Sequence, residues 1–567
     1  MEVTYLPQEA SSAGILISTR LHAPGKARRS SFCSNPISGG RLLCHNGTPD
    51  QSLQQPVMSR RCNKAHVCAA CNSSAQHPKP QESIPGSYGA PFIGALRDRL
   101  DFFWFQGEDE FFRKRKERYG STIFRVNFVP GMPGIALLDQ KSYLVLYDPT
   151  KVDKHDTFVG ALLPKTDFTG GYRVLAYLDP LHPKHAILKS FIMELIKSNS
   201  SRILPEFATA FSETFNQMET ALSEGREANF SSSVKMLVLD FLLRAIVHRD
   251  PRAVGAAALG DDGPSLLESW IAVQFAAIAQ AGLPPILEEI FLHSFPLPFS
   301  LIRANYQRIY SFFDTYAIEA LDVAKERFDL ERDEATHNLI FAIGVNAWLG
   351  LIKLLPSIIF YVGKNNSHLH DKLRGEIRAA VASNGGRLSP KAIESMPLVR
   401  STVLEVLRLA SPAKYQYARA RKDLIIESHD ASFVVKKGEL LCGCLSMASR
   451  DPVIFENPDS FIPERFEGGD GEKLLPHLLW SNGPEHLHTT SQNKQCAGKD
   501  LVILIASLLL AHIFIRYDTF ELVDQPSSAA RKPPQICFKT LQIRATDPTS
   551  DLNWAQRISS ISSSDQT

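Results

Sequence analysis

The stretch that decides the fold is Asn493-Lys-Gln-Cys496-Ala-Gly-Lys-Asp500, because it places a cysteine directly before a long apolar run. That run predicts a buried helix from about Cys496 to Phe514. Backbone N–H groups and the helix dipole at such an N-terminus lower the pKa of a thiol, so Cys496 is a candidate thiolate. Gly498 would let the start of this helix approach another group closely. The alternative is a buried structural cysteine.

Three further motifs precede this stretch. Glu405-Val-Leu-Arg408 lies in a periodic helix from about Pro397 to Ala410, and its two charged residues share one helix face at i and i+3. Alone, such a pair is typical of a solvated surface. The second motif, Phe461-Ile-Pro-Glu-Arg-Phe466, adds another arginine, Arg465, and Trp480-Ser-Asn-Gly-Pro484 follows it before the cysteine.

In this order, the motifs resemble those of the cytochrome P-450 superfamily. The resemblance implies a mainly α fold with small β-sheets in a single haem-thiolate domain. It also implies haem b (iron protoporphyrin IX) as cofactor, Cys496 as axial ligand of the haem iron, and Glu405, Arg408 and Arg465 as a structural triad. A thiolate ligand pushes electron density through the iron and favours O–O cleavage.

The rest of the chain fits one large catalytic domain, which we expect to span residues 84–545 without an internal linker. A helix is predicted at about Phe105 to Tyr119, and strands at Ser121 to Phe128 and Gly134 to Asp139. Mostly helical sequence runs from His182 to about Ala410, and a β-rich stretch spans Leu424 to Gly443. The net charge of +2 argues against nucleic acid as a partner.

Residues 1–80 and 546–567 differ from this domain in composition. The first segment is rich in Ser and Arg and poor in acids, which is typical of a chloroplast transit peptide; a disordered leader is the alternative. The Ser-rich C-terminal segment is expected to be a disordered tail. Three leader cysteines, Cys62, Cys68 and Cys71, are a weak signal for zinc. No apolar run of about 20 residues starts the chain, and Leu339 to Val362 is better explained as a buried helix than as a membrane anchor.

Departures from the usual cytochrome P-450 pattern are informative. An insertion, Glu485 to Asn493, precedes the cysteine, and Lys494 replaces an arginine. The central helix, Asn338 to Val362, lacks the acid–threonine pair that serves dioxygen activation. The chain has no flavin or nicotinamide domain. These features favour a substrate that already carries an O–O bond and needs no reductase.

The departures resemble the plant enzymes that act on fatty-acid hydroperoxides: allene oxide synthases, hydroperoxide lyases, divinyl ether synthases and epoxyalcohol synthases. The resemblance covers residues 84–525. Its specific marks are Ile84-Pro-Gly-Ser-Tyr-Gly, Ser121-Thr-Ile-Phe-Arg125, Thr169-Gly-Gly-Tyr-Arg173, Tyr177-Leu-Asp-Pro180, Glu427-Ser-His-Asp-Ala431, Ser481-Asn-Gly-Pro-Glu485 and the cysteine stretch.

The resemblance carries site residues with it. Asn346 would hydrogen-bond the substrate hydroperoxide above the haem, and Phe158 would stabilise an electron-poor carbon through its aromatic face. The residues that would face the haem propionates are Lys154, His185, Lys189 and Lys494. The alternative for Asn346 is a structural hydrogen bond, and the alternative for Phe158 is an ordinary place in the core. For the four basic residues, the alternative is a plain surface charge.

The expected function is that of an allene oxide synthase (hydroperoxide dehydratase) acting without O2 or NADPH, in the chloroplast, on a hydroperoxide such as 13-hydroperoxy linolenic acid. Phe158, the Cys-Ala-Gly-Lys-Asp sequence and the leader favour the synthase. A hydroperoxide lyase is the first alternative, since Ala176, Gly344, Ala418-Arg-Ala-Arg421 and Leu440-Leu-Cys442 look more like lyases. Divinyl ether synthase, epoxyalcohol synthase, an NADPH-driven monooxygenase and a haem-based sensor follow. Peripheral attachment to a plastid membrane is compatible with all of these.

Overall fold

The computed structural model describes residues 79–90, 93–128, 133–159, 164–280, 283–364, 366–524 and 535–543. The chain divides into two compact units, Leu16–Lys79 and a larger one made of Met1–Ile15 with Pro80–Thr567. All described residues except Lys79 belong to the larger unit. The predicted transit peptide (residues 1–80) therefore lies outside the described residues apart from its last two, as do its cysteines, and the predicted tail (546–567) lies wholly outside.

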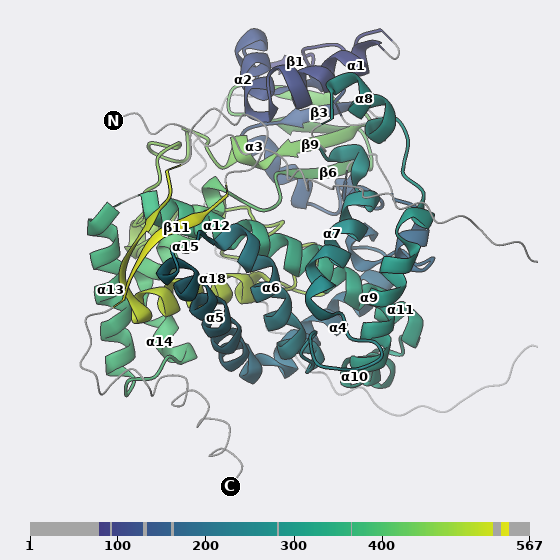
Figure 1. The fold of residues 1–567 in the computed structure, drawn as a ribbon. Coiled ribbons are helices and arrows are strands. Elements are labelled where there is room, and N and C mark those ends of the chain that lie inside the picture. Colours follow the sequence, from purple (N-terminus) through teal and green to yellow (C-terminus); the bar gives the residue numbers. More distant parts are fainter. Residues whose placement is uncertain are drawn as a thin grey trace, which may run out of the picture. The chain divides into compact units, whose positions relative to one another are not determined.

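Helices dominate the described part of the chain (Figure 1). The α-helices are α1 (Ile93–Leu100), α2 (Glu108–Tyr119), α3 (Gln140–Tyr143), α4 (Pro183–Ser198), α5 (Ser200–Ser223), α6 (Phe230–Leu242), α7 (Gly263–Gln274), α8 (Pro285–Glu288), α9 (Arg303–Tyr316), α10 (Ile318–Phe328), α11 (Arg332–Phe341), α12 (Leu349–Lys364), α13 (Asn366–Ser383), α14 (Pro390–Glu394), α15 (Pro397–Leu409), α16 (Leu445–Ala448), α17 (Gly468–Glu472) and α18 (Lys499–Arg516). The π-helices are η1 (Asp101–Phe105), η5 (Leu243–Val247), η8 (Glu289–His293) and η10 (Ala342–Trp348).

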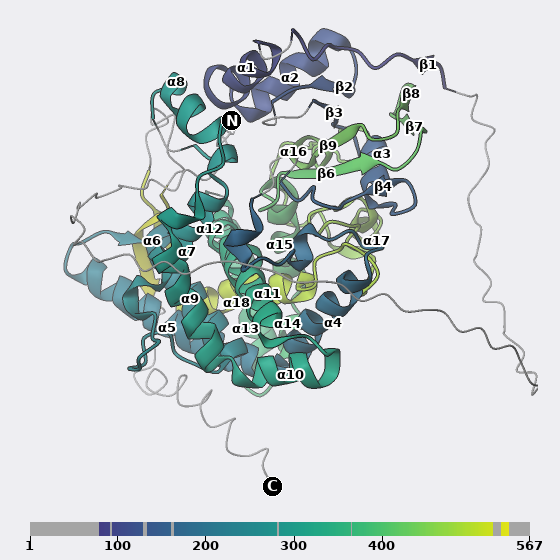
Figure 2. The ribbon, with the colours of Figure 1, turned by 90° about the vertical axis from the view of Figure 1, so that its right-hand side faces the viewer.

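The strands form three small sheets. They are β1 (Gln81–Glu82), β2 (Ile123–Val126), β3 (Gly134–Leu137), β4 (Val152–Asp153), β5 (Ala228–Asn229), β6 (Tyr415–Ala420), β7 (Leu424–Glu427), β8 (Ser432–Val435), β9 (Leu440–Cys444), β10 (Tyr517–Leu522) and β11 (Cys537–Ile543). The largest sheet has the order β2-β3-β9-β6-β4, and the others are β1-β8-β7 and β10-β11-β5. Figure 2 shows β9 and β6 side by side beneath α1 and α2.

Strand β9 lies at the centre of the five-stranded sheet, and all five of its residues are buried. It pairs parallel with β3, where Gly134 lies opposite Leu440, and antiparallel with β6, where Tyr415 lies opposite Cys444. Gly443 is required here: a Cβ at this position would come within 2.4–2.5 Å of Leu146 and Tyr143 side-chain atoms. The sequence did not predict β6, which forms one wall of the site described below.

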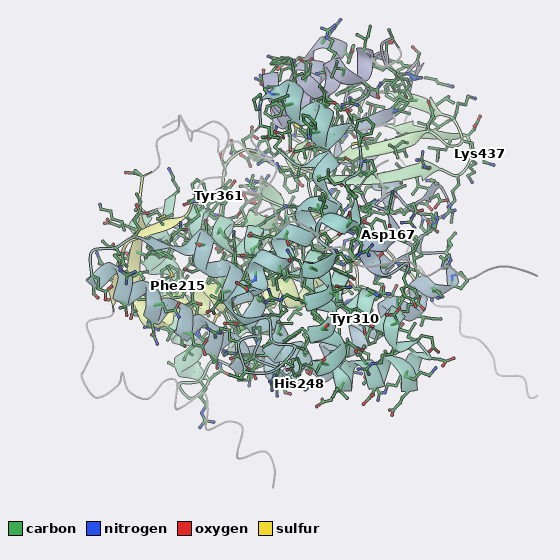
Figure 3. The ribbon with its side chains drawn as sticks, turned by 45° about the vertical axis from the view of Figure 1, so that its right-hand side comes forward. Asp167, Phe215, His248, Tyr310, Tyr361 and Lys437 are labelled. Carbon is green, nitrogen blue, oxygen red and sulfur yellow. The ribbon has the colours of Figure 1, made fainter. Side chains whose placement is uncertain are left out.

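The helical core is formed around α18, whose residues from Ile505 to Phe514 are all buried, as expected for a helix that is apolar on every side. Helices α5, α12, α13 and α15 pack against it. At one edge of this core, Phe215 of α5 reaches the strands β10 and β11, with ring centroids 5.9 Å from Tyr517 and 6.0 Å from Phe538 (Figure 3).

The predicted central helix is one continuous helical run, Arg332–Lys364, in which η10 separates α11 from α12. Within the described residues it is the one helix long and apolar enough to cross a membrane. However, 56% of its most apolar window is buried inside the protein, as in the core helix of a globular fold.

Candidate functional site

Cys496 lies in a tightly held loop that leads into α18. Its backbone N–H donates to the Ser481 carbonyl (2.8 Å), and the Thr489 hydroxyl donates to the Cys496 carbonyl (2.9 Å). The Gln495 amide donates to Ser481 Oγ (3.1 Å) and to the Pro484 carbonyl (3.0 Å), which closes the loop on both sides. The helix itself begins at Lys499, three residues after the predicted start at about Cys496.

Burial raises the pKa of the Cys496 thiol, although the Gly498 backbone N–H and the positive charge of Lys189 oppose this. The backbone N–H at the helix start does lower this pKa, as predicted, but the expected low pKa is not found because desolvation outweighs that effect. A bound iron would deprotonate a coordinating thiol outright.

The insertion before the cysteine, Glu485 to Asn493, is folded back onto the start of α18. Lys499 Nζ donates to the carbonyls of Glu485 (2.7 Å) and Leu487 (2.9 Å). The Glu485 carboxylate is buried and accepts from Trp480 Nε1 at 3.0 Å. The inserted residues thus hold the cysteine loop against the start of α18 through these hydrogen bonds.

Behind this loop, the structure brings together Glu405, Arg408 and Arg465. The Glu405 carboxylate accepts two hydrogen bonds from Arg408 (2.7 and 2.8 Å) and two from Arg465 Nε (both 3.1 Å). Arg408 also donates to the carbonyls of Ser449, Pro458 and Ser460. Because Glu405 and Arg408 are fully buried, this network joins α15 rigidly to the segment before the cysteine loop.

Four basic side chains converge beside the cysteine loop. Lys154 Nζ donates to Asn482 Oδ1 (2.7 Å), and Lys189 Nζ donates to the Asn493 carbonyl (2.6 Å). Lys494 Nζ donates to the carbonyls of Leu175, Ala176 and Leu178 at 2.6–3.1 Å. The fourth group, His185, is buried, and its Nδ1 has no hydrogen-bond partner among the described residues.

Among the residues that the structure describes, the four basic groups have no ion-pair partner within 4 Å. Burial lowers the pKa of Lys154 and Lys494 to about 7 and that of Lys189 to about 8. Burial and the neighbouring lysines lower the pKa of His185 to about 4. Among the described residues, no carboxylate lies within 4 Å of these three lysine nitrogens, although Asp179 acts on Lys154 from farther away. Such a set of buried cations fits an anionic ligand, and the two propionates of haem would supply the missing charge.

A cavity lies at the same place. Its lining includes Tyr147, Lys154, Asn482, Asn493 and Lys494. The hydroxyl of Tyr177, in the segment whose carbonyls bind Lys494, is buried without a hydrogen-bond partner among the described residues. The thiol, the cations and these unsatisfied polar atoms together fit a haem held by Cys496 through its iron and by the basic cluster through its propionates.

Phe158 lies beside Tyr177, in the segment whose carbonyls bind Lys494. The Phe158 ring is 5.8 Å from Tyr177 and 6.1 Å from Phe341, edge to face in both cases. The residue is 40% exposed, unlike the fully buried aromatic residues of the core. The Phe158 loop is fixed by the Asp156 N–H, which donates to the Tyr177 carbonyl (2.9 Å), and by the Thr157 hydroxyl, which donates to the Tyr417 carbonyl (3.1 Å).

Asn346 lies in the π-helix η10, five residues after Phe341. Its side chain is exposed and makes no hydrogen bond with the part of the chain that the structure describes. The alternative of a structural hydrogen bond for this amide is therefore not supported. A π-helical turn inside a longer helix often marks a functional position.

Sequence reasoning missed Asn482, which joins two of the cations. It accepts from Lys154 and donates through Nδ2 to the Lys494 carbonyl (2.9 Å), in a left-handed conformation (φ 62°) that asparagine tolerates. Asn493 has the same kind of role for Lys189. Both residues stand in stretches that resembled the family, but only the fold shows which cations they hold.

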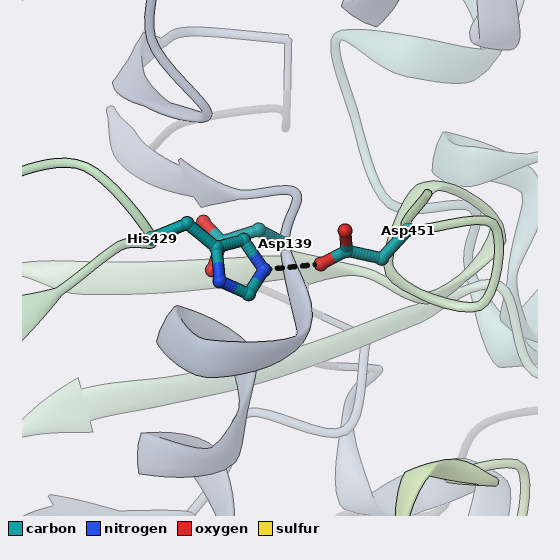
Figure 4. Close-up of side chains that lie close together, drawn as sticks. All are labelled: Asp139, His429 and Asp451. Atoms are coloured by element: carbon teal, nitrogen blue, oxygen red, sulfur yellow. Dashed lines mark hydrogen bonds and ion pairs between the residues drawn. The ribbon is translucent and has the colours of Figure 1, made fainter. Parts of the chain in front are cut away.

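A separate group of potential metal ligands consists of Asp139, His429 and Asp451, whose nearest side-chain atoms lie within 4.8 Å of one another (Figure 4). Its oxygens are engaged by the protein. Asp139 caps α3 by accepting from the Ser142 N–H (2.9 Å), and Asp451 accepts from the Gln140 N–H (2.9 Å) and from His429 (2.7 Å). These hydrogen bonds fix the β7–β8 turn to the sheet, so a structural role is sufficient to explain why the three side chains lie together.

Comparisons with known proteins agree with this geometry. The cytochrome P450 family profile matches residues 357–544. A divinyl ether synthase of Selaginella moellendorffii is 46% identical over 453 residues, which cover 78% of this chain and 92% of the relative. The chloroplastic allene oxide synthase of Arabidopsis thaliana is 46% identical over 476 residues, which cover 83% and 91%; the chloroplastic allene oxide synthase 1 of Solanum lycopersicum is 43% identical, with 78% and 83% covered.

The fold matches the haem domain of a cytochrome P450DA mutant with a TM-score of 0.60 at 15% identity, over 83% of this chain and 99% of that one. The predicted fold, mainly helical with small sheets, is confirmed, and the fold and family imply haem as the cofactor. The chain belongs to the cytochrome P450 family, among relatives that include allene oxide synthases and divinyl ether synthases.

Proposed function

We propose that the protein is an allene oxide synthase, which removes water from a fatty-acid hydroperoxide to give an allene oxide in oxylipin biosynthesis. Relatives named allene oxide synthase are 40–46% identical over most of the chain and come from several plants. The 13-hydroperoxide of linolenic acid is the proposed substrate.

The observation that carries the proposal is the position of Phe158. Its half-exposed ring lies beside Tyr177 and Phe341, next to the segment that binds Lys494. The face of an aromatic ring stabilises nearby positive charge. Homolysis of the O–O bond would leave a carbon radical next to an epoxide on the substrate chain, and the cleaved hydroxyl group would pass to the haem. Transfer of one electron from this radical back to the haem would create such a charge. Loss of a proton from the carbon chain would then give the allene oxide, with the hydroxyl group leaving as water. An aliphatic residue at this place would not favour that route.

Haem held by Cys496 would supply the iron that cleaves the O–O bond of the substrate. Lys154, His185, Lys189 and Lys494 would hold its propionates and so set its orientation. The Asn346 amide would donate a hydrogen bond to the hydroperoxide and position it. Glu405, Arg408 and Arg465 would keep the cysteine loop in place from behind.

The central helix supports a reaction without O2, NADPH or a reductase. From Phe341 to Gly350 its sequence is Phe-Ala-Ile-Gly-Val-Asn-Ala-Trp-Leu-Gly, with no acid and no hydroxyl group to deliver protons to dioxygen. A hydroperoxide already carries the oxygen–oxygen bond, so the reaction needs no external electrons.

Divinyl ether synthase is the second candidate, because relatives of that name from Selaginella moellendorffii are 46% and 44% identical. Its product forms from the same hydroperoxide, so the two activities differ in how the pocket guides the carbon chain after O–O cleavage. The resemblance of some segments to hydroperoxide lyases makes aldehyde formation the third outcome to test.

Product analysis decides among them. The holoenzyme without its leader is incubated with 13-hydroperoxy linolenic acid in the absence of O2 and NADPH. Ketols and a cyclopentenone, which arise from an allene oxide in water, support the proposal. Divinyl ethers or short-chain aldehydes with an oxo-acid assign the protein to another activity, and no turnover returns the monooxygenase and sensor alternatives.

We further propose that the protein works in the plastid as a peripheral membrane protein. The composition of residues 1–80 and the chloroplastic names of several relatives support the plastid. The support for a membrane surface is an apolar patch on two neighbouring segments, one formed by α1 and η1 and the other running from α8 to Phe295 just after η8 (Figure 1). Arg99 and Glu289 join the two segments by an ion pair. The residues of the patch, each at least 40% exposed, are Ile93, Leu96, Phe105, Ile286, Leu287, Ile290, Phe291 and Phe295.

A further inference from the structure

A lysine in the central helix has no role in the site as described so far. Lys353 lies in α12, directly before the buried residues Leu354 and Leu355. Its side chain is half-buried, and among the described residues no carboxylate lies within ion-pair distance of it. Burial and the charge of Lys414 lower its pKa to about 8. A partly desolvated cation without a counterion is costly unless a ligand supplies the charge.

Lys353 shares one helix face with Asn346. The two residues are seven positions apart in a helix that is π-helical up to Trp348 and α-helical from Leu349, so they are separated by roughly 10 Å along the axis. Neither residue belongs to the buried face of the helix. Between them lies Gly350, at i+4 from Asn346 and i−3 from Lys353. A Cβ added to Gly350 would meet no atom within 4 Å, so the space beside the helix is open between the two polar groups.

Strand β6 connects the same two places. Near Phe158, the Tyr417 carbonyl accepts from Thr157. Two residues earlier, the Tyr415 hydroxyl donates to Glu108 (3.0 Å), which also pairs with Lys414 (2.9 Å). Lys414 and Glu108 are the groups whose charges act on Lys353. The helix and the strand therefore both run from the Phe158–Asn346 end to a second, charged end.

At the charged end, Lys353 has no ion-pair partner among the described residues. The Glu108 carboxylate already accepts from Lys414 and from Tyr415. Asp109, the other carboxylate whose charge acts on Tyr415, accepts a hydrogen bond from the Ser446 hydroxyl. A carboxylate from a ligand would give Lys353 the ion pair that it lacks among the described residues.

We infer that Lys353 binds the carboxylate of the fatty-acid substrate while Asn346 binds the hydroperoxide group at the other end of the open face. The inference rests on the proposed function and extends it to the substrate class: the free acid, rather than an esterified lipid, is the preferred substrate. The spacing of the two groups also restricts the distance between carboxylate and hydroperoxide, and so selects the position of the hydroperoxide on the chain. Lys353 is thus a specificity-determining residue.

The test compares a free acid with its methyl ester, which has the same chain without the charge. KM and kcat are measured for 13-hydroperoxy linolenic acid and its methyl ester with the wild-type holoenzyme and with Lys353→Met and Lys364→Met. Lys364 is the matched control because it ends the same helix and is exposed. In Lys353→Met we expect kcat/KM for the acid to fall at least tenfold and that for the ester to stay within about twofold. Lys353→Arg should keep the preference for the acid, and Lys364→Met should not alter it.

A binding measurement separates this inference from the proposed function. The non-reactive 13-hydroxy acid and its methyl ester are titrated into each variant, and the haem absorption change gives Kd. This readout does not depend on which product the enzyme makes, so an enzyme that forms aldehydes or divinyl ethers can still show the role of Lys353. An unchanged acid-to-ester ratio of both Kd and kcat/KM in Lys353→Met, with normal haem absorption, would overturn the inference.

Discussion

The Phe158 ring meets the Phe341 ring edge to face, with centroids 6.1 Å apart, so that a loop residue rests on the helix turn that leads to Asn346. We expect Phe158→Leu to shift the products from those of an allene oxide towards aldehydes. Leucine keeps the apolar volume but offers no aromatic face to a positive charge. The loss of about 1–2 kcal/mol corresponds to a roughly tenfold change in product ratio.

Gas chromatography of the extracted products measures this ratio. Phe299→Leu is the control, since Phe299 is also partly exposed and also makes an edge-to-face contact, with Phe168, but outside the site. An unchanged ratio in Phe158→Leu would remove the structural reason for preferring the synthase to the lyase.

Replacement of Glu405 by glutamine should strongly destabilise the fold. It would leave two guanidinium groups, those of Arg408 and Arg465, without the carboxylate that they share in the protein interior. Breaking a buried pair in this way costs about 3–5 kcal/mol. Urea unfolding of the holoenzyme measures the change.

Glu464→Gln serves as the comparison for that experiment. Glu464 pairs with Lys372 at 2.8 Å, but both side chains are about 40% exposed. An exposed pair contributes about 0–1 kcal/mol. Equal losses in the two variants would show that the Glu405 network does not hold the segment before the cysteine loop in place.

The sequence predicted local motifs, such as single helices and the spacing of residues within them. The predicted helix from Pro397 to about Ala410 is α15, and its spacing of glutamate and arginine does put the two groups in contact. The strand β6 was missed because Tyr415–Ala420 is only half-buried and its alternation is weak. The low pKa expected for Cys496 was also wrong, because burial depends on how the whole protein covers the loop.

Contacts between distant segments could not be derived from local patterns. Lys494 is held by carbonyls that lie 316–319 positions earlier in the chain, and Lys154 by an amide 328 positions later. The resemblance to a family pointed to the lysines of the site. It did not point to Asn482 and Asn493, which hold Lys154 and Lys189. From the sequence, Lys353 is only a charge that interrupts an apolar run, and its place beside Glu108 and Lys414 follows from the fold.

Lys154→Met should weaken haem retention. The Lys154 side chain is buried beside the cysteine loop and has neutral partners, Asn482 and Gln416. Without its charge, one haem propionate would lose a charge-assisted contact worth about 1.5–3 kcal/mol. The rate of haem transfer to an excess of an apo-globin should therefore rise about tenfold or more.

Lys151→Met is the control for haem retention, because Lys151 is half-exposed and pairs with Asp148 at the surface. A haem-transfer rate that is the same in Lys154→Met as in the wild type would contradict the assignment of Lys154 to the propionates.

His512 should make the protein sensitive to acid. It is buried in α18 and stacks on Phe211 at 5.0 Å, and burial lowers its pKa to about 4 from an ordinary 6.5. The unfolded chain therefore binds more protons than the folded one between pH 6.5 and 4. Stability from this residue is fully present above pH 6.5 and is lost as the pH falls towards 4, by up to about 3 kcal/mol.

In His512→Phe, the free energy of unfolding should fall less steeply between pH 6.5 and 4.5 than in the wild type. Replacement of the exposed His368 by glutamine should leave the wild-type slope. If His512→Phe shows the same slope as the wild type, other groups cause the acid sensitivity.

Asn346→Ala should reduce activity without reducing stability. The side chain is exposed and has no hydrogen-bond partner in the described part of the chain, so its removal costs the folded state little. Its proposed role is to hold the hydroperoxide for O–O cleavage, and loss of a hydrogen bond that positions a reacting group lowers kcat by about tenfold to a hundredfold.

Asn338→Ala, two turns earlier, should instead reduce stability, because that amide is buried. It accepts from the Leu175 N–H (3.0 Å) and donates to the Glu334 carbonyl (2.9 Å). Its loss should cost about 1–3 kcal/mol of stability. Thermal unfolding and steady-state kinetics on both variants separate the two roles, and full activity in Asn346→Ala would exclude this amide from the reaction.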